Sequence, residues 1–362
     1  MRRLLLAAGS ALITACAAVP APAQTPAQSA PAQPAATAPA QALDAAERRQ
    51  VVEQLAAKLD SDFVYAEVGS RYAATLRSNL AAGAYDGLSD PAAFGDKVTA
   101  DLQAVSRDGH LRLALMSAFT APRPAPAAVA AAPVSTRPSG PPGMEEAKMI
   151  GDVAYLRFNM FPQDPAVAEA ARAFLLAHAD AKGVIIDARP HRGGGFEVMN
   201  AILPLLYPER TALVRLETRA GPEAEDPVVD GKYFIQQPSA PAVVVCDHVI
   251  TPDKAETRLQ HVPVYYLTSG KTASAGEHLA LAFKRTHRAV LIGETTRGAG
   301  HSGSLQPIGD RFAAFIPVGR TFDPDTGWDW EGKGVTPDVA VPTDQALDEA
   351  LKRLAATGVK TS

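Results

Sequence analysis

The chain has 362 residues, with 35 Lys and Arg against 39 Asp and Glu, and a formal net charge of −4 at pH 7. This balance, without any run of Lys or Arg, gives no indication of nucleic-acid binding. The length allows two domains, or one domain with attached segments.

The first residues indicate an export signal over residues 1–18. Met1-Arg2-Arg3 is a positively charged start, and the Ala- and Leu-rich stretch from Leu4 to Ala18 is too short to span a membrane comfortably. Ile13-Thr14-Ala15-Cys16 resembles a bacterial lipoprotein box, so Cys16 would be lipidated and would attach the protein to a membrane. The alternative is ordinary cleavage after Ala21-Pro22-Ala23. We favour lipidation; either route leaves Cys246 alone, which excludes an intrachain disulfide.

Two segments rich in Ala and Pro separate the parts that are expected to fold. Residues 19–42 consist almost entirely of Ala, Pro, Gln and Thr, which predicts an extended, disordered tether. Residues 121–143 have a similar composition and predict a linker. The ordered parts are therefore expected over residues 43–120 and 144–356.

The first ordered part shows helical periodicity. Asp44 is placed to cap a helix whose apolar stripe includes Val51, Leu55 and Leu59. Asp90-Pro91 has the residue types that begin a further helix. The pattern predicts a small domain of three helices over residues 43–120, which ends in a turn at Asp108-Gly109-His110 and an alternating strand.

The second ordered part alternates between strands and helices. Helices are expected over 165–181, from Ser274 onward and over 346–354. Short apolar runs predict strands over 153–158, 183–187, 242–246, 264–267, 289–294 and 312–318. This alternation predicts an α/β domain over residues 144–356 with a largely parallel sheet.

The strand at 264–267 leads into small residues and then a helix that starts near Ser274. At such a place a hydroxyl meets the positive end of the helix dipole and free backbone N–H groups. Reactions that develop an oxyanion can use this position, so Ser274 is a candidate nucleophile. The structural alternative is a plain N-cap.

Three other segments carry candidate chemistry. Gly193-Gly194-Gly195 follows a buried strand and can turn backbone N–H groups toward an anion or a carbonyl oxygen, although a plain turn is the alternative. His110 follows Asp108 and Gly109 at the entrance of a strand, where a histidine is often only structural. The polar segment 328–338 contains Glu331 and has a surface hairpin as its alternative.

Other motifs are excluded by the residues present. Gly270-Lys271-Thr272 lacks the first glycine of a phosphate loop, because Tyr265 occupies that position. The G-x-S-x-G elbow lacks its first glycine at Thr272. The eight histidines have no metal-ligand spacing, so neither a metal nor another cofactor is expected.

Taken in order, several motifs resemble the tail-specific (C-terminal processing) serine peptidase family, which includes the tricorn protease core and the repeats of interphotoreceptor retinoid-binding protein. The resemblance covers roughly residues 150–345, and it also includes the Asp-Gly-His-Leu turn at His110. The motifs are Asp187-x-Arg189-x-x-x-Gly193-Gly194, Thr272-Ala273-Ser274-Ala275-Gly276-Glu277, Gly293-Glu294-Thr295 with Gly298 and Gly300, and Glu331-Gly332-x-Gly334-Val335-x-Pro337-Asp338.

The resemblance implies a ClpP/crotonase-like α/β core and a peptidase that acts on polypeptides. Tail-specific members pair serine with a lysine, but Ala299 occupies the lysine position in this chain. The tricorn-type branch instead uses a histidine base and a downstream glutamate, which His110 and Glu331 match. His191 stands where the family commonly has asparagine.

The expected site therefore combines Ser274 as nucleophile, His110 as base and Glu331 as the residue that orients the site or supplies its charge. Gly193, Gly194 and Ala275 are expected to form the oxyanion loop. The alternative function is a non-catalytic module that binds hydrophobic ligands, because the retinoid-binding branch has the same architecture.

Overall fold

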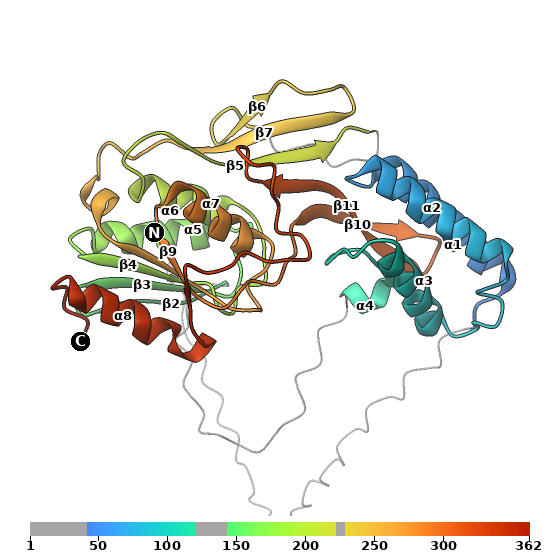
Figure 1. The fold of residues 1–362 in the computed structure, drawn as a ribbon, viewed down its shortest axis with the longest axis horizontal. Helices are drawn as coiled ribbons and strands as arrows, with labels where there is room; N and C mark the ends of the chain where they lie inside the picture. The colour runs from blue at the N-terminus through green and yellow to red at the C-terminus, as the bar shows by residue number, and fades with distance from the viewer. Residues whose placement is uncertain (1–41, 121–142, 222–228) are drawn as a thin grey trace, which may run out of the picture. The chain divides into compact units, whose positions relative to one another are not determined.

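The computed structural model describes residues 42–120, 143–221 and 229–362 (Figure 1). The expected export signal, the lipidation site Cys16, and nearly all of the tether and the linker lie outside these residues. Within the described ranges, no helix combines the length and the apolar composition needed to cross a membrane.

A mainly parallel sheet of six strands forms the α/β part. Its order is β12 (Val339–Ala340), β9 (Val290–Gly293), β8 (Val264–Thr268), β4 (Gly183–Asp187), β3 (Val153–Phe158) and β2 (Met144–Ile150), with β2 alone antiparallel to its neighbour. Helices α5 (Pro165–Ala177), α6 (Glu197–Ile202) and α7 (Ala275–Thr286) lie against one face, and α8 (Ala346–Ala356) lies against the other (Figure 1).

Alternation along the strands explains these two layers. Leu156 and Ile186 belong to the cluster that α5–α7 cover, whereas Tyr155 and Ile185 pack with Leu354 of α8. Neighbouring residues of a strand point to opposite faces, so a strand that is apolar throughout is covered on both sides. The candidate segments around Gly193 and Ser274 follow β4 and β8 at the same edge of this sheet, because β4 and β8 are parallel neighbours.

A second sheet of six strands is antiparallel. Its order is β1 (Arg112–Leu115), β11 (Phe312–Phe322), β5 (Thr211–Arg219), β7 (Val243–Ile250) and β6 (Phe234–Gln237), and β10 (His301–Ile308) also pairs with β11. The expectation that residues 242–246 form a fully buried strand of the parallel sheet was wrong. They belong to β7, which pairs antiparallel with β5 and β6 and is only partly buried. A short apolar run does not indicate which sheet it will join.

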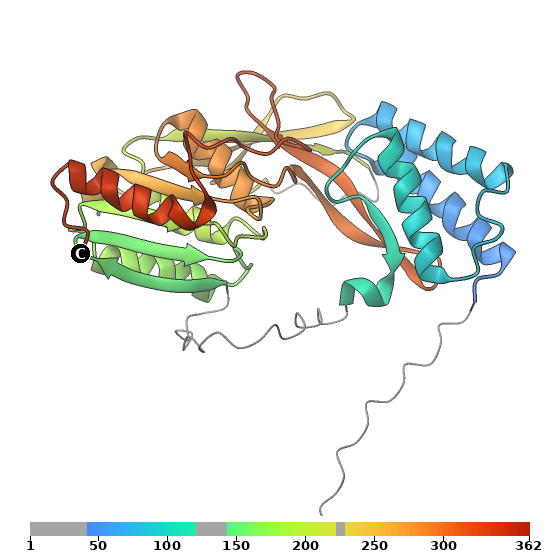
Figure 2. The same cartoon turned by 60° about the horizontal axis from the view of Figure 1, so that its bottom comes forward.

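The N-terminal helices α1 (Ala45–Asp62), α2 (Ala66–Ala81) and α3 (Pro91–Val105) share a core with β10 and β11 (Figure 2). Asp44 accepts a hydrogen bond from the Glu47 N–H at 2.8 Å, and Asp90 accepts one from the Ala93 N–H at 2.7 Å, so both helices begin at the expected caps. The remaining elements are α4 (Met116–Thr120) and 3-10 turns at Leu203–Leu205, Arg258–His261 and Thr343–Gln345.

Candidate active site

Ser274 has an unusual backbone conformation. It immediately precedes α7 with φ 52° and ψ −117°, and it is one of two non-glycine residues with positive φ in the described part of the chain. An N-cap residue normally has an extended backbone, so Ser274 is not an ordinary cap. Residues in such sparsely populated conformations cluster at active sites, and a sharp strand-to-helix turn is the way α/β-hydrolases expose a nucleophilic serine.

A buried carboxylate holds this turn in place. Glu277 accepts hydrogen bonds from the N–H of Ser274 at 2.8 Å and from the N–H of Ala299 at 2.9 Å. Its other oxygen accepts from the N–H of Gly298 and the hydroxyl of Thr296, both at 2.6 Å. Burial raises the pKa of Glu277, and these hydrogen bonds oppose the rise. Sequence reasoning did not assign this role, although Ser-x-x-Glu before an apolar run is the signal of a capping box.

The glycine loop lies directly against Ser274. Gly193 has φ 113°, and a Cβ built at this position would lie 3.0 Å from the Cβ of Ser274. The N–H of Gly193 donates to Nδ1 of His191 at 3.1 Å. Burial lowers the pKa of His191 to about 3, so its ring is neutral and can accept this bond. His191 therefore shapes the loop through this bond.

Two backbone donors remain near the serine. Among the described residues, the N–H groups of Gly194 and Ala275 donate to no protein acceptor, whereas that of Gly193 is already committed to His191. Ala275 is the first residue of α7, where a backbone N–H has no partner within the helix. Of the three expected oxyanion residues, Gly194 and Ala275 thus carry N–H donors that a ligand can use. Gly193, which has no Cβ, allows the loop to lie close to Ser274.

His110 borders the same cavity as Ser274. This cavity has a volume of about 590 Å³, and Gly193, Gly194 and Ala275 also line it. The ring of His110 stacks on Phe315 with centroids 5.2 Å apart. No hydrogen bond joins Ser274 to His110 in the described structure, but catalytic hydrogen bonds are often long without substrate. Burial lowers the pKa of His110, Asp108 opposes this, and the charges of His301 and Arg297 lower it further, so the ring is neutral and able to accept a proton.

Glu331 contacts the main chain beside His110. Its carboxylate accepts from the N–H of Gly109 at 2.6 Å, of Gly300 at 2.5 Å and of His301 at 3.1 Å. Burial raises the pKa of Glu331, the charge of His301 lowers it, and the net result is a raised value. Nδ1 of His110 has no hydrogen-bond partner among the described residues. Glu331 therefore holds the segment that carries His110, through its backbone.

Sequence reasoning missed His301 and Asp108. Nδ1 of His301 donates to Oδ2 of Asp108 at 2.6 Å, and both side chains are buried. One ligand atom from each of Asp108, His301 and Glu331 lies within 4.8 Å of the others, which is a spacing that could suit a cation. Every carboxylate oxygen in this group already accepts a hydrogen bond, however, so the hydrogen bonds account for the arrangement. His301 carried no local motif that would have distinguished it.

No lysine is among the described residues that line this cavity. Ala299, at the position of the dyad lysine, is buried, and its N–H is bound by Glu277. Lys271 is exposed and borders a different cavity, together with Arg189 and Glu294. The neighbouring Trp330 is buried, so the segment 328–338 is not a plain surface hairpin.

Comparison with known proteins identifies the family to which the chain is similar. Residues 152–341 match peptidase family S41, and residues 36–150 match the N-terminal domain of peptidase S41 in eukaryotic IRBP. A carboxy-terminal-processing protease of Bartonella bacilliformis is 33% identical over 90 residues, which make up 25% of this chain and 20% of that protein. The carboxy-terminal processing protease CtpB of Bacillus subtilis is 24% identical over 189 residues, or 52% of this chain and 34% of that protein. The matches thus span about a third or less of these two relatives.

Solved structures show the same fold. A protein of Parabacteroides merdae, assigned as a peptidase, matches with a TM-score of 0.58 and 14% identity, over 86% of this chain and 98% of that one. The photosystem II D1 C-terminal processing protease matches with a TM-score of 0.50 and 16% identity, over 82% and 94%. These likenesses confirm the expected α/β fold with N-terminal helices. The family match covers more than half of the chain and confirms the resemblance seen in its motifs, so this protein belongs to peptidase family S41.

Proposed function

We propose that this protein is a serine endopeptidase of the bacterial envelope that hydrolyses polypeptide substrates through Ser274, His110 and Glu331. One observation carries the proposal: Ser274, in a strained turn, and His110, from a distant part of the chain, line one cavity with the N–H donors of Gly194 and Ala275. Family membership and the likeness to processing proteases support it.

In the proposed reaction, Oγ of Ser274 attacks the carbonyl carbon of the scissile peptide while the neutral ring of His110 takes the hydroxyl proton. The N–H groups of Gly194 and Ala275 bind the oxyanion, and each such donor contributes on the order of 3 kcal/mol. The peptide amine leaves with a proton, and water then hydrolyses the acyl-serine ester. Glu331 acts through the main chain at Gly109, which it keeps beside the cavity.

A covalent probe tests the nucleophile. We expect a fluorophosphonate to label the wild-type protein and casein to be cleaved, whereas Ser274→Ala abolishes both because no other residue is proposed to attack the carbonyl. Lys271→Ala is the matched control and should retain activity, since Lys271 borders another cavity. Equal labelling of wild type and Ser274→Ala would contradict the proposal. Absence of turnover together with a co-purifying lipid would favour the alternative, a module that binds hydrophobic ligands.

The envelope location rests on the first residues of the sequence. Export through residues 1–18 and lipidation of Cys16 would attach the peptidase to a membrane on its exported side. We expect mass spectrometry of the mature protein to find acyl chains on Cys16. In cell fractionation, Cys16→Ser should move the protein from the membrane fraction to the soluble fraction. A mature N-terminus just after Ala23, without lipid, would instead show ordinary secretory processing.

A further inference from the structure

Two carboxylates join the two segments that carry histidines at the cavity. Oδ1 of Asp108 accepts from the backbone N–H of His110 at 2.8 Å, and Oδ2 accepts from the ring of His301 at 2.6 Å. Glu331 in turn accepts from the N–H of Gly109 and from that of His301. His110 and His301 are therefore held on the same pair of carboxylates, although they come from opposite ends of the ordered chain.

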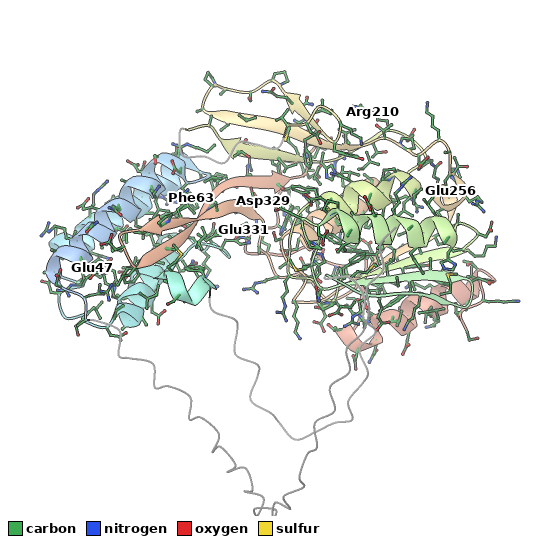
Figure 3. The ribbon with its side chains drawn as sticks, turned by 180° about the vertical axis from the view of Figure 1, so that it is seen from behind. Glu47, Phe63, Arg210, Glu256, Asp329 and Glu331 are labelled. Atoms are coloured by element: carbon green, nitrogen blue, oxygen red, sulfur yellow. The ribbon has the colours of Figure 1, made fainter. Side chains whose placement is uncertain are left out.

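The ring of His301 is held in place by its neighbours, and one of its two nitrogens has no hydrogen-bond partner among the described residues. It packs edge-on against Tyr65, with centroids 5.4 Å apart, and against Phe63, at 6.2 Å. Figure 3 labels Phe63, just after α1, and Asp329 and Glu331, on the segment after β11, and the hydroxyl of Tyr65 links the two segments by donating to Asp329 at 2.9 Å. His301 is only 5% exposed and lines the cavity of Ser274, yet its Nε2 has no partner among the described residues. A buried polar atom without a partner calls for an explanation, and a catalytic role is one.

The charged groups around the two rings differ. His301 faces Asp108, Glu331 and Asp329, and the hydroxyl of the neighbouring Tyr65 donates to Asp329. Burial alone would lower the pKa of His301, but the hydrogen bond and the charge of Asp108, helped by the other two carboxylates, raise it above its ordinary value. Burial is the main cause that raises the pKa of Tyr65 to about 12, so Tyr65 does not titrate in the pH range of the histidines.

His110 has the opposite surroundings. It faces Asp108, His301 and Arg297, and its pKa is lowered, mainly by burial. Two titratable groups of one site whose environments move their pKa values apart are the usual sign of an acid and a base. The arrangement thus provides, at one cavity, a ring whose pKa is lowered and a ring whose pKa is raised.

We propose that His301, which donates from Nδ1 to Asp108 and lines the cavity of Ser274, is a second catalytic residue that donates its Nε2 proton to the departing peptide amine. The proposal rests on the peptidase function proposed above. In acylation, the proton of Ser274 moves to His110, the C–N bond of the substrate breaks, and the amine takes the proton of His301. In deacylation, water adds to the ester carbonyl and gives a proton to His301, while His110 returns its proton to Ser274. The sum is one water consumed for one peptide bond hydrolysed.

The pH profile of kcat/KM of the full-length protein tests this assignment. We expect a bell shape, with an acidic limb from deprotonation of His110 below pH 6.5 and an alkaline limb from deprotonation of His301 above it. His301→Gln should lower kcat about 10²-fold or more, as for the loss of a general acid, and abolish the alkaline limb. Its acidic limb should move to higher pH, because the charge that lowers the pKa of His110 has gone. His261→Gln, which replaces an exposed histidine, is the control and should keep both limbs.

A second measurement covers the case in which His301→Gln does not fold. Asp108→Asn removes the carboxylate that stabilises the imidazolium, so the alkaline limb should move to lower pH. NMR titration of the histidine rings should give His301 a higher pKa than His110 in the wild type. An alkaline limb that persists in His301→Gln, or a His301 that titrates below His110, would overturn the proposal. Absence of wild-type turnover at every pH would refute the peptidase function itself, and the NMR titration would still show whether His301 is charged.

Discussion

At the scale of single residues, the site depends on backbone groups as much as on side chains. Glu277 is buried and Glu331 is partly buried, and the hydrogen bonds of both carboxylates go largely to main-chain N–H groups, at Ser274 and at Gly109 respectively. Such charge-assisted bonds are stronger than those between neutral groups. They hold the nucleophile turn and the segment of His110 in one geometry, which is the preorganisation that oxyanion chemistry requires.

The close approach of Gly193 to Ser274 predicts that a methyl group added at position 193 lowers peptidase activity. In Gly193→Ala, the new Cβ would lie 3.0 Å from the Cβ of Ser274 and would also force a non-glycine residue to φ 113°. We expect peptidase activity to fall at least about 10²-fold, since small misplacements of reacting groups have such effects. Casein turnover and fluorophosphonate labelling would measure the loss, with circular dichroism as the check on folding. Gly270→Ala is the control, because a Cβ there meets no atom within 4 Å. Wild-type activity in Gly193→Ala would contradict the close approach.

At the scale of elements, the hairpin of β10 and β11 connects the N-terminal helices to the rest of the fold. β1 pairs antiparallel with β11, and β11 also pairs with β5 of the antiparallel sheet. The hairpin begins at His301, and β1 begins two residues after His110. This pairing brings the two histidines to one cavity, so the helices contribute to the site through the strand that follows them.

A substitution in this hairpin tests how much the core that it shares with the N-terminal helices contributes to stability. Phe312 of β11 is 1% exposed and contacts Phe94 of α3 edge-on at 5.6 Å. Phe312→Ala should lower the free energy of unfolding by about 3–5 kcal/mol, through lost burial and the cavity left behind. Urea unfolding followed by circular dichroism would measure this. Leu305→Ala in β10 is the control, because Leu305 is 37% exposed and surface changes cost little. Equal unfolding midpoints for the two variants would contradict a shared core.

At the scale of the whole molecule, buried ion pairs make stability depend on pH. Asp187, at the end of β4, is fully buried and accepts hydrogen bonds from Tyr155, Arg157 and Arg189. Burial would raise its pKa, but the hydrogen bond and charge of Arg189 outweigh burial and hold the pKa below its ordinary value of 3.8. A carboxyl with a lowered pKa stabilises the fold above its unfolded value, and the stabilisation is lost as the pH falls through the folded value.

Acid unfolding should therefore depend on Asp187. We expect the urea midpoint of unfolding of the wild type to fall as the pH drops below 3.8. In that range Asp187 is protonated in the unfolded chain and must release the proton when the protein folds. In Asp187→Asn, the midpoint should be lower at neutral pH and should change less over the same acidic range. Urea titrations at a series of pH values would measure the two slopes. Parallel slopes in the two proteins would show that Asp187 is not the responsible group.

The sequence predicted those features that depend on local pattern. Continuous apolar runs predicted the buried strands, Asp44 and Asp90 predicted helix starts, and ordered motifs around Ser274 and Gly193 predicted the α/β fold and the family. β7 was assigned to the wrong sheet, because a short apolar run carries no information about its partner strands. The roles of Ser274, His110 and Glu331 remain predictions that the proposed experiments test.

By itself, then, the sequence determined the class of fold and the strand–turn–helix that carries Ser274, because periodicity and turn residues act over a few neighbouring positions. Only the tertiary structure decided which side chains meet. The β1–β11 pairing placed His110 at the cavity of Ser274. The fold also brought His301, at the start of β10, into hydrogen-bond contact with Asp108. These contacts join residues that are remote in the chain, and neither their spacing nor their neighbours in the sequence indicate them.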